Sequence, residues 1–308
     1  METENQTKIT EFILLGLTDQ SETQHILFVV FLLVYVVILS ANALIIVVTW
    51  KDQTLHTPMY FFLCILSSLD ICYSSSCIPK MLKDLLSEWK TISFSGCVVQ
   101  MYIALAFGLV EYLLLAVMAW DRYMAISQPL KYTIIMNWSV CVNLTISVWI
   151  TGFVLSITAV ALMLTLPFCG HNRTNHFMCE VITVIRLTCI DIHPIDVAFF
   201  MSNVLVIIIP LSVIIFSYIH IITSVLKISS TDGRRKAFST CSSHLTVVIL
   251  FYCTAMGVYL RPRSMMSEKD KIISLVYVVL APMLNPLIYT LRNSEVKEAL
   301  KKTMRRKK

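Results

Sequence analysis

The chain has 308 residues, 57% of them hydrophobic, and its mean hydropathy is +0.75. A soluble globular domain is typically about 45–50% apolar, so this composition indicates a non-aqueous solvent and argues against an ordinary soluble enzyme or binding module. The 25 basic and 19 acidic residues give a net charge of +6, which lies largely in the C-terminal tail. Anionic lipid headgroups explain a basic tail on such a chain more simply than nucleic acid does.

Seven segments are long and apolar enough to cross a membrane, which takes roughly 20 residues. They are residues 26–50, 58–82, 98–120, 140–163, 195–226, 238–260 and 272–291. Several contain proline, serine, asparagine or a charged residue, which lipid tolerates only where neighbouring helices satisfy the polar groups. We therefore predict an all-α integral membrane protein with a seven-transmembrane helix bundle over residues 26–291.

The two ends of the chain are predicted to lie on opposite sides of the membrane, because the number of spans is odd. Residues 1–25 carry five acidic residues and only a short apolar patch, so we expect no cleaved signal peptide there. Basic residues are concentrated in the tail and in the connection between the fifth and sixth spans, and basic segments stay inside. Residues 1–25 are therefore expected to be extracellular, and residues 292–308 cytoplasmic.

The tail itself has the pattern of a short amphipathic helix. Asn293 or Ser294 can cap it, and Val296, Leu300 and Met304 follow at four-residue spacing. Lysines and arginines occupy its other faces. This pattern predicts an interfacial helix that lies on the inner leaflet.

Four of the ten cysteines fall on the predicted outer side, where thiols oxidise. They are Cys97, Cys169, Cys179 and Cys189. We expect two disulfides, but four cysteines allow three pairings that spacing alone does not separate. Among the glycosylation sequons, Asn5 is the best candidate, and Asn172 stays open because it is crowded between Cys169 and Cys179.

Six short strings carry recognisable motifs along the chain. They are LHTPMYFFL at 55–63, PKML at 79–82, MAWDRYMAI at 118–126, SY at 217–218, KAFSTCSSHL at 236–245 and PMLNPLIY at 282–289. Taken alone, Asp121 beside Arg122 at a membrane boundary could equally be an interfacial pair. In this order and spacing, however, the strings resemble the olfactory receptors typical of land vertebrates, within the rhodopsin-like G-protein-coupled receptors. The resemblance covers essentially the whole chain.

Three positions depart from the family's usual pattern without removing a charged group. Ala41 and Cys253 stand where glycine is usual, and Trp120 replaces a tyrosine. Because Cys253 lies near the expected pocket, its side chain is expected to alter the packing there.

The resemblance implies a receptor and not an enzyme. It would bind a small, mostly apolar volatile ligand in the outer half of the bundle and activate a stimulatory, olfactory-type G protein, which raises cyclic AMP. Its place would be the plasma membrane, in the cilia of olfactory neurons. The family's outer disulfide maps to Cys97 with Cys179 and a second to Cys169 with Cys189, and Cys97 with Cys189 is the alternative.

The residues expected to contact the ligand share faces in the outer halves of four spans. They are Ala104, Leu105, Gly108, Leu109, Tyr112, Phe199, Ser202, Asn203, Val206, Tyr252, Ala255, Met256, Tyr259, Leu275 and Val278. Small, apolar and a few hydrogen-bonding side chains together suit a ligand of low polarity. Close helix packing by small residues is the alternative interpretation.

Residues that are missing from the spans argue against two classes of ligand. The third span presents Ala104, and not a carboxylate, toward the expected pocket, which disfavours amines held by a simple ion pair. Residues 272–291 contain no lysine that could form a Schiff base, so the chain is not an opsin.

Polar groups deeper in the bundle are expected to form a core and a switch. Asp70, Glu111 and Asn285 must face inward, and a sodium ion or proton shared by the two acids is one hypothesis, a purely structural hydrogen-bond network the other. No other cofactor or metal is expected. The resemblance assigns the switch and G-protein contacts to Asp121, Arg122, Tyr123, Tyr218, Asn285, Pro286 and Tyr289. Arg122 is expected to pair with Asp121 at rest and to turn toward Tyr218 when active.

The sequence lacks the features expected of a transporter, a channel or an intramembrane enzyme. A transporter or channel would show internal repeats and paired interrupted helices, which the sequence lacks. An intramembrane enzyme would need a motif such as His-Glu-x-x-His or Gly-x-Ser-x-Gly, and neither occurs. The expected partners are therefore an odorant, a heterotrimeric G protein and membrane lipids, with no nucleic acid.

Overall fold

The structure is a computed structural model that describes residues 9–168, 170–188, 193–260, 270–292, 296–299 and 302. These residues include seven helical segments long and apolar enough to cross a membrane. They are α1 (Ser21–Lys51), α2 (Pro58–Leu85), α3 (Phe94–Ser127), α5 (Trp138–Leu164), α7 (His193–Leu226), α8 (Thr231–Tyr259) and the continuous run α9 (Asp270–Leu275), η3 (Val276–Leu280) and α10 (Ala281–Arg292). The predicted all-α, seven-helix bundle is confirmed.

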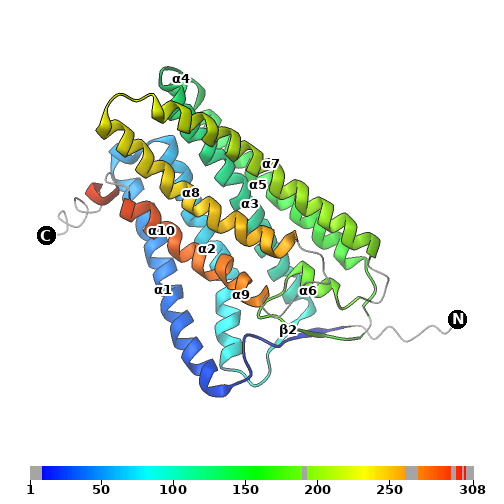
Figure 1. The fold of residues 1–308 in the computed structure, drawn as a ribbon. Helices are drawn as coiled ribbons and strands as arrows, with labels where there is room; N and C mark the ends of the chain where they lie inside the picture. Colours follow the sequence, from blue (N-terminus) through cyan, green and yellow to red (C-terminus); the bar gives the residue numbers. More distant parts are fainter. Residues whose placement is uncertain are drawn as a thin grey trace.

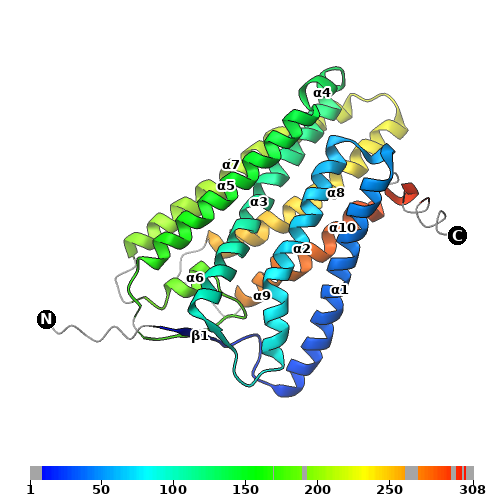
Figure 2. The same ribbon diagram turned by 180° about the vertical axis from the view of Figure 1, so that it is seen from behind.

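The helices lie side by side and alternate in direction, so the connections gather at two ends of the bundle (Figures 1 and 2). One end carries a small β-sheet and α6 (Val181–Ile185), and we call it the sheet end. The opposite end carries α4 (Pro129–Ile135) and the connection between α7 and α8, and we call it the α4 end. The 3-10 turn η1 (Gln53–Leu55) links α1 to α2.

Most of the long helices begin at residues that suit a helix N-terminus. Pro58 stands in the first turn of α2, where its missing N–H costs no hydrogen bond. Side-chain oxygens of Ser93, Asn137 and Ser230 accept hydrogen bonds from Gly96, Val140 and Gly233 at 3.1, 3.1 and 3.3 Å and so cap α3, α5 and α8. The Ser230 cap starts α8 at Thr231, before the apolar segment predicted from residue 238, so its polar first turns extend beyond that segment.

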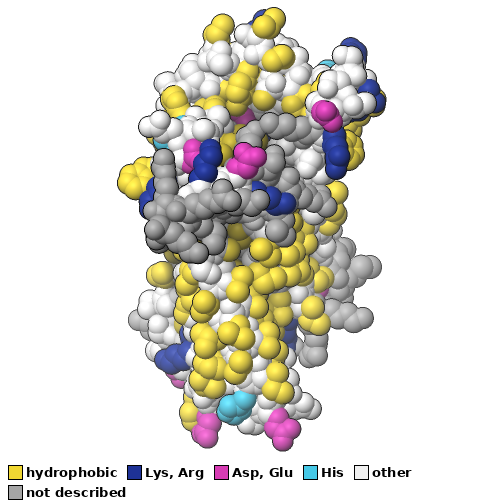
Figure 3. All heavy atoms as spheres, turned by 90° about the vertical axis from the view of Figure 1, so that its left-hand side faces the viewer, with side chains coloured by type: hydrophobic (Ala, Val, Ile, Leu, Met, Phe, Trp, Pro, Cys, Tyr) yellow, Lys and Arg dark blue, Asp and Glu magenta, His cyan; other side chains and the backbone are white. Residues whose placement is uncertain are grey.

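The flanks of the bundle are apolar, whereas its interior contains the polar side chains. Exposed leucine, isoleucine and valine side chains run along the outer faces of α1, α5 and α7. Figure 3 shows hydrophobic side chains gathered along the middle of one flank, with charged side chains nearer its two ends. This distribution fits a protein whose lateral solvent is hydrocarbon.

Helix contacts inside the bundle are close and partly polar. The amide of Asn42 in α1, which is fully buried, donates to the carbonyl of Pro282 in α10 at 3.0 Å. Gly152 of α5 faces α3 so closely that a β-carbon there would lie 2.5 Å from the side chain of Val110 and 3.3 Å from the carbonyl oxygen of Ala106. Glycine is therefore required at this crossing, as is common where helices meet in membranes.

A three-stranded sheet covers the sheet end, and the sequence did not predict it. Strand β1 (Glu11–Leu14) pairs antiparallel with β2 (Thr91–Ser93) and parallel with β3 (Arg173–Thr174), in the order β2-β1-β3. Phe12 and Leu14, on one face of β1, are buried against the cluster that holds Cys97. The segment that precedes α1 is thereby fixed over the ends of the helices.

Only part of the predicted interfacial helix lies within the described residues. Residues 296–299 are helical, and Val296, which belongs to the predicted apolar face, is buried, as is Ala299. Lys302 lies 4.0 Å from Asp52, which follows α1. The remaining residues of the predicted helix, including Leu300 and Met304, lie outside the described part of the chain.

Candidate functional site

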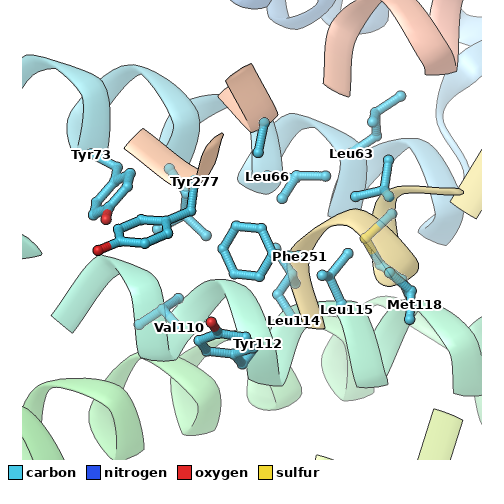
Figure 4. Packing of buried hydrophobic residues seen from close by; sticks show 14 of the residues in the cluster. Leu63, Leu66, Tyr73, Val110, Tyr112, Leu114, Leu115, Met118, Phe251 and Tyr277 are labelled. Carbon is cyan, nitrogen blue, oxygen red and sulfur yellow. The ribbon is translucent and has the colours of Figure 1, made fainter. Parts of the chain in front are cut away.

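A central cavity of about 70 Å³ lies inside the bundle at the sheet end. Its wall combines the connection between α5 and α7, which includes α6, with α2, α3, α7, α8 and η3. The lining residues are Tyr73, Met101, Ala104, Leu105, Gly108, Leu109, Tyr112, Met178, Cys179, Glu180, Val181, Asn203, Val206, Ile207, Phe251, Tyr259 and Tyr277. Gly108 leaves space, because a β-carbon there would meet nothing within 4 Å outside its own helix. Figure 4 shows Tyr73, Tyr277, Phe251 and Tyr112 as neighbours in the bundle interior.

A larger side cleft of about 440 Å³ adjoins the central cavity between α5 and α7. Six residues line both spaces: Leu105, Leu109, Val181, Asn203, Val206 and Tyr259. Toward the flank the cleft is lined by Leu155 and Leu162 of α5, which are 40% and 56% exposed. The central cavity therefore continues sideways into an apolar space that reaches the lipid-facing surface.

The structure brings together most of the residues that the sequence assigned to the ligand. Eight of them line the central cavity: Ala104, Leu105, Gly108, Leu109, Tyr112, Asn203, Val206 and Tyr259. Phe199 and Ser202 line only the side cleft. Their role in binding a ligand stays a prediction, but their common location is a property of the fold.

Five other predicted ligand residues line neither space. They are Tyr252, Ala255, Met256, Leu275 and Val278. Tyr252 instead points to α3, where its hydroxyl donates to the carbonyl of Tyr112 at 3.0 Å. Neighbours of Tyr252 and Val278 line the cavity instead: Phe251 precedes Tyr252 by one position, and Tyr277 precedes Val278 by one position. Adjacent residues on a helix are separated by a rotation of about 100° around its axis. Amphipathic spacing does not determine the rotation of a helix when both of its faces are apolar.

The connection between α5 and α7 contributes cavity residues that the sequence did not predict. Met178, Cys179, Glu180 and Val181 all line the central cavity. The disulfide between Cys97 of α3 and Cys179 holds this loop over the helix ends, as predicted, and excludes the alternative pairing of Cys97 with Cys189. The predicted Cys97–Cys179 disulfide could have indicated that the residues next to Cys179 line the cavity. Cys169, Cys189 and the sequon residue Asn5 lie outside the described part of the chain.

Glu180 places a carboxylate in the cavity wall, at the point where the loop meets α8 and η3. Its Oε1 accepts hydrogen bonds from the hydroxyls of Tyr259, at 3.3 Å, and of Tyr277. His176 lies 3.5 Å from its Oε2, and the His176 Nε2 also lies 3.2 Å from the hydroxyl of Ser274. Burial lowers the pKa of His176, so this ring is neutral near pH 7.

A polar core lies deeper in the bundle, where α2, α3 and α10 meet. The amide of Asn285 donates to both carboxylate oxygens of Asp70, at 3.0 and 3.1 Å, and to Oε1 of Glu111 at 3.4 Å. All three side chains are buried. The second Glu111 oxygen and the Asn285 carbonyl oxygen have no hydrogen-bond partner among the described residues. The core thus offers uncompensated oxygen atoms, which suit a proton or a hard cation.

Two of the predicted switch residues, Asp121 and Arg122, lie toward the α4 end, but with different partners from those expected. Arg122 donates to the carbonyl of Thr240 in α8 at 3.0 Å, and Asp121 accepts from the hydroxyl of Tyr132 at 2.9 Å. No ion pair between Asp121 and Arg122 occurs among the salt bridges of the described residues. The expected pair is absent because Tyr132 of α4 occupies the acid and the guanidinium extends to α8.

A second set of hydrogen bonds joins three helices beside Arg122. The hydroxyl of Tyr218 in α7 lies 2.8 Å from Nδ1 of His244 and 3.0 Å from the carbonyl of Cys241, both in α8. Nε2 of His244 lies 3.2 Å from the carbonyl of Leu115 in α3. Since a carbonyl only accepts, Nε2 is the donor, and in a neutral ring Nδ1 accepts from Tyr218.

The other predicted switch residues lie in α3 and α10. Tyr289 of α10 lines a small space beside Arg122, and its buried hydroxyl has no hydrogen-bond partner among the described residues. Tyr123 packs against Trp120, Phe216 and His220. Pro286 lies inside α10, one residue after Asn285. The arrangement can therefore hold α8 against α3 and α7, with unpaired polar atoms available for a second arrangement.

Comparisons with known proteins agree on one family. The family model described as "Olfactory receptor" matches residues 31–307. The chain is 48% identical to human olfactory receptor 13D1 over 99% of its own length and 89% of that protein, and 50% identical to human olfactory receptor 10A7 over 99% and 96%. It is 46% identical to the canine olfactory receptor-like protein OLF3 over 99% and 96%. These relatives are receptors, which agrees with the prediction that the chain is not an enzyme. The chain, a multi-pass plasma-membrane protein, belongs to the olfactory receptor family.

Proposed function

We propose that this protein binds a small, mostly apolar volatile odorant in the central cavity and then activates a stimulatory, olfactory-type G protein that raises cyclic AMP. The observation that carries the proposal is the path of α8. This helix contributes Phe251 and Tyr259 to the cavity wall at the sheet end, and its Thr240 carbonyl is held by Arg122 at the α4 end. A ligand that prefers one position of α8 can therefore change the contacts of Arg122.

Activation in this proposal is a shift between two packings of α8. An odorant changes their populations only by the difference between its affinities for them. Release of Arg122 from Thr240 would free its guanidinium for Tyr218 or for the G protein. Asp121, Tyr123, Asn285, Pro286 and Tyr289 complete the switch in the same proposal: Tyr289 lines the space beside Arg122, and Asn285, on the same helix, holds the polar core.

The orientation follows from charge. The sheet end faces outward and the α4 end faces the cytoplasm, since the basic tail and the basic connection between α7 and α8 belong to the α4 end. In that orientation residues 1–25, with the sequon at Asn5, are extracellular, and residues 292–308 are cytoplasmic. The Cys97–Cys179 bond then lies on the oxidising side, which supports this orientation. The site of action is the ciliary membrane of olfactory neurons.

The polar core is proposed to hold a sodium ion or a shared proton in one of the two packings. Asp70 and Glu111 share the Asn285 amide, and the unpaired oxygens of Glu111 and Asn285 could ligate a cation. Replacing external sodium with a large organic cation should then raise basal cyclic AMP, and Glu111→Gln should abolish that response. Equal basal output with and without sodium would leave only the proton or the structural network.

The test of the receptor function is an odorant screen on transfected cells with a cyclic-AMP readout and a surface stain. Odorants should raise cyclic AMP in cells that express the protein, and Arg122→Ala should abolish the signal without loss of surface protein. Surface-expressed wild type that answers no volatile would refute the ligand class. Persistent cyclic-AMP output from Arg122→Ala would refute the switch.

A further inference from the structure

The wall of the central cavity is rich in aromatic rings. Five of them face it: Tyr73, Tyr112, Phe251, Tyr259 and Tyr277. Tyr112 and Phe251 lie edge to face with their centroids 4.8 Å apart, and the rings of Tyr73 and Tyr277 lie 6.5 Å apart. Aromatic faces attract cations, and the attraction grows when the cation is removed from water.

One acidic side chain, Glu180, stands among these rings in the described part of the wall. It is only 8% exposed, so little water reaches it. The groups that contact it are the hydroxyls of Tyr259 and Tyr277 and the neutral ring of His176. No lysine or arginine forms an ion pair with Glu180 among the described residues.

A buried carboxylate without a cationic partner is costly, and a cation at the cavity would offset part of that cost. Tyr259 and Tyr277 both donate to Oε1, and a carboxylate can accept about four hydrogen bonds. The carboxylate therefore keeps acceptor capacity for a donor on a ligand. A positively charged donor would make a stronger bond than a neutral one.

The space beside the cavity suits the rest of such a ligand. The central cavity of about 70 Å³ is small, whereas the adjoining side cleft of about 440 Å³ is lined mainly by apolar side chains, with Thr158, Thr165, Ser202 and Asn203 among them. Leu105, Leu109 and Val206 line both. A polar head at Glu180 could thus be continuous with an alkyl chain in the cleft.

We propose that the odorant of this receptor is a small aliphatic amine, whose ammonium group binds Glu180 and the surrounding aromatic rings while its alkyl chain occupies the side cleft. The proposal rests on the receptor function proposed above and narrows its ligand class. It also replaces the expectation from Ala104, which disfavoured amines: the carboxylate comes from the connection between α5 and α7, and not from α3.

The test compares ligands that share one carbon chain. Hexylamine, hexanol and hexanal are applied to cells that express the wild type, Glu180→Gln or Glu88→Gln, with cyclic AMP and surface protein measured for each. Glu180→Gln keeps the shape of the side chain and removes its charge. Glu88→Gln removes the same charge from an exposed position at the same end of the bundle, and so controls for the surface potential.

In the wild type, hexylamine should be the most potent of the three. Glu180→Gln should raise its half-maximal concentration by about 10- to 100-fold, the loss expected for a hydrogen bond to a charged group. Hexanal, which has no donor, should shift by less than about 3-fold, and Glu88→Gln should shift neither. Glu180→Asp should retain the preference for the amine in weakened form, and it serves as the test if Glu180→Gln does not reach the surface.

Two results would overturn the proposal. One is a wild type that answers hexanal or hexanol better than hexylamine. The other is a Glu180→Gln or Glu180→Asp receptor that reaches the surface with its amine response unchanged. Either result leaves the receptor function intact as long as some odorant is active, whereas silence toward every volatile would remove the receptor function as well.

Discussion

The sheet end and the α4 end of the bundle use their polar groups in different ways. Around the central cavity, Glu180, Asn203 and Tyr259 border empty space, and Glu180 lies on a connection that the Cys97–Cys179 disulfide anchors. At the α4 end, by contrast, hydrogen bonds of Arg122, Tyr218 and His244 join α3, α7 and α8. The first arrangement leaves groups available for a ligand, and the second holds helices in one position. Substitutions in the two ends should therefore fail in different assays.

The largest effect, on surface delivery of the whole protein, is expected at the crossing of α3 and α5, on which both ends of the bundle depend. Gly152→Leu would place a side chain against Val110 and the backbone of Ala106, where even a β-carbon comes within 2.5 Å. Overpacking of this kind typically costs 1–3 kcal/mol or more, and the crossing joins α3 to α5. Surface protein should fall to a small fraction of the wild-type amount in flow cytometry.

Gly257→Ala is the matched control, because a β-carbon at Gly257 would meet nothing within 4 Å outside its helix. It should reach the surface normally. Normal surface delivery of Gly152→Leu would show that α3 and α5 do not approach each other as closely as described.

The next largest effect is expected at the α4 end. His244→Phe keeps a buried ring and removes the hydrogen bonds to Tyr218 and to the Leu115 carbonyl. Each such bond contributes about 0.5–1.5 kcal/mol, so their loss should raise basal cyclic AMP several-fold while the potency of agonists changes little. Ser243→Ala should leave basal output as it is, because among the described residues the Ser243 hydroxyl bonds within α8, to the Ser239 carbonyl. A His244→Phe receptor as quiet as wild type would mean that these bonds do not hold the unliganded state.

At the sheet end the expected effect is on potency alone. Asn203→Ala changes a residue that lines both the central cavity and the side cleft, and it should shift the half-maximal concentration of an agonist by about 3- to 10-fold at unchanged basal output. Met256→Ala serves as the comparison, because Met256 lines neither space. Equal shifts from the two substitutions, across several agonists, would place the ligand elsewhere.

Hydropathy and motif order were sufficient to predict the bundle, because apolar segments of this length have few other folds. The polar core was predictable for the same reason, since Asp70, Glu111 and Asn285 cannot face lipid. The rotation of the helices was not predictable. Because α8 is apolar on more than one face, the spacing that selected Tyr252 could not show whether Tyr252 or Phe251 faces the cavity. The position of Glu180 depends on the path of a loop without periodicity, and Arg122 contacts a backbone carbonyl, which any residue supplies.

The smallest effect is expected from pH, through the loop that carries Glu180. Burial holds the pKa of His176 below its usual value of about 6.5, so the unfolded chain binds a proton at this residue more readily than the folded chain. The stability linked to its neutral ring is complete above about pH 6.5 and decreases as the pH falls below that value. Glu180, Asp270 and Lys271 share this environment, and the two acids limit the loss because they favour the charged ring. Purified receptor should therefore melt a few degrees lower at pH 5.5 than at pH 7.5 in a thermal shift assay, and His176→Gln should reduce that difference, whereas substitution of the exposed His25 should not. An equal pH-dependent fall in all three proteins would exclude His176 as its source and assign it to other groups.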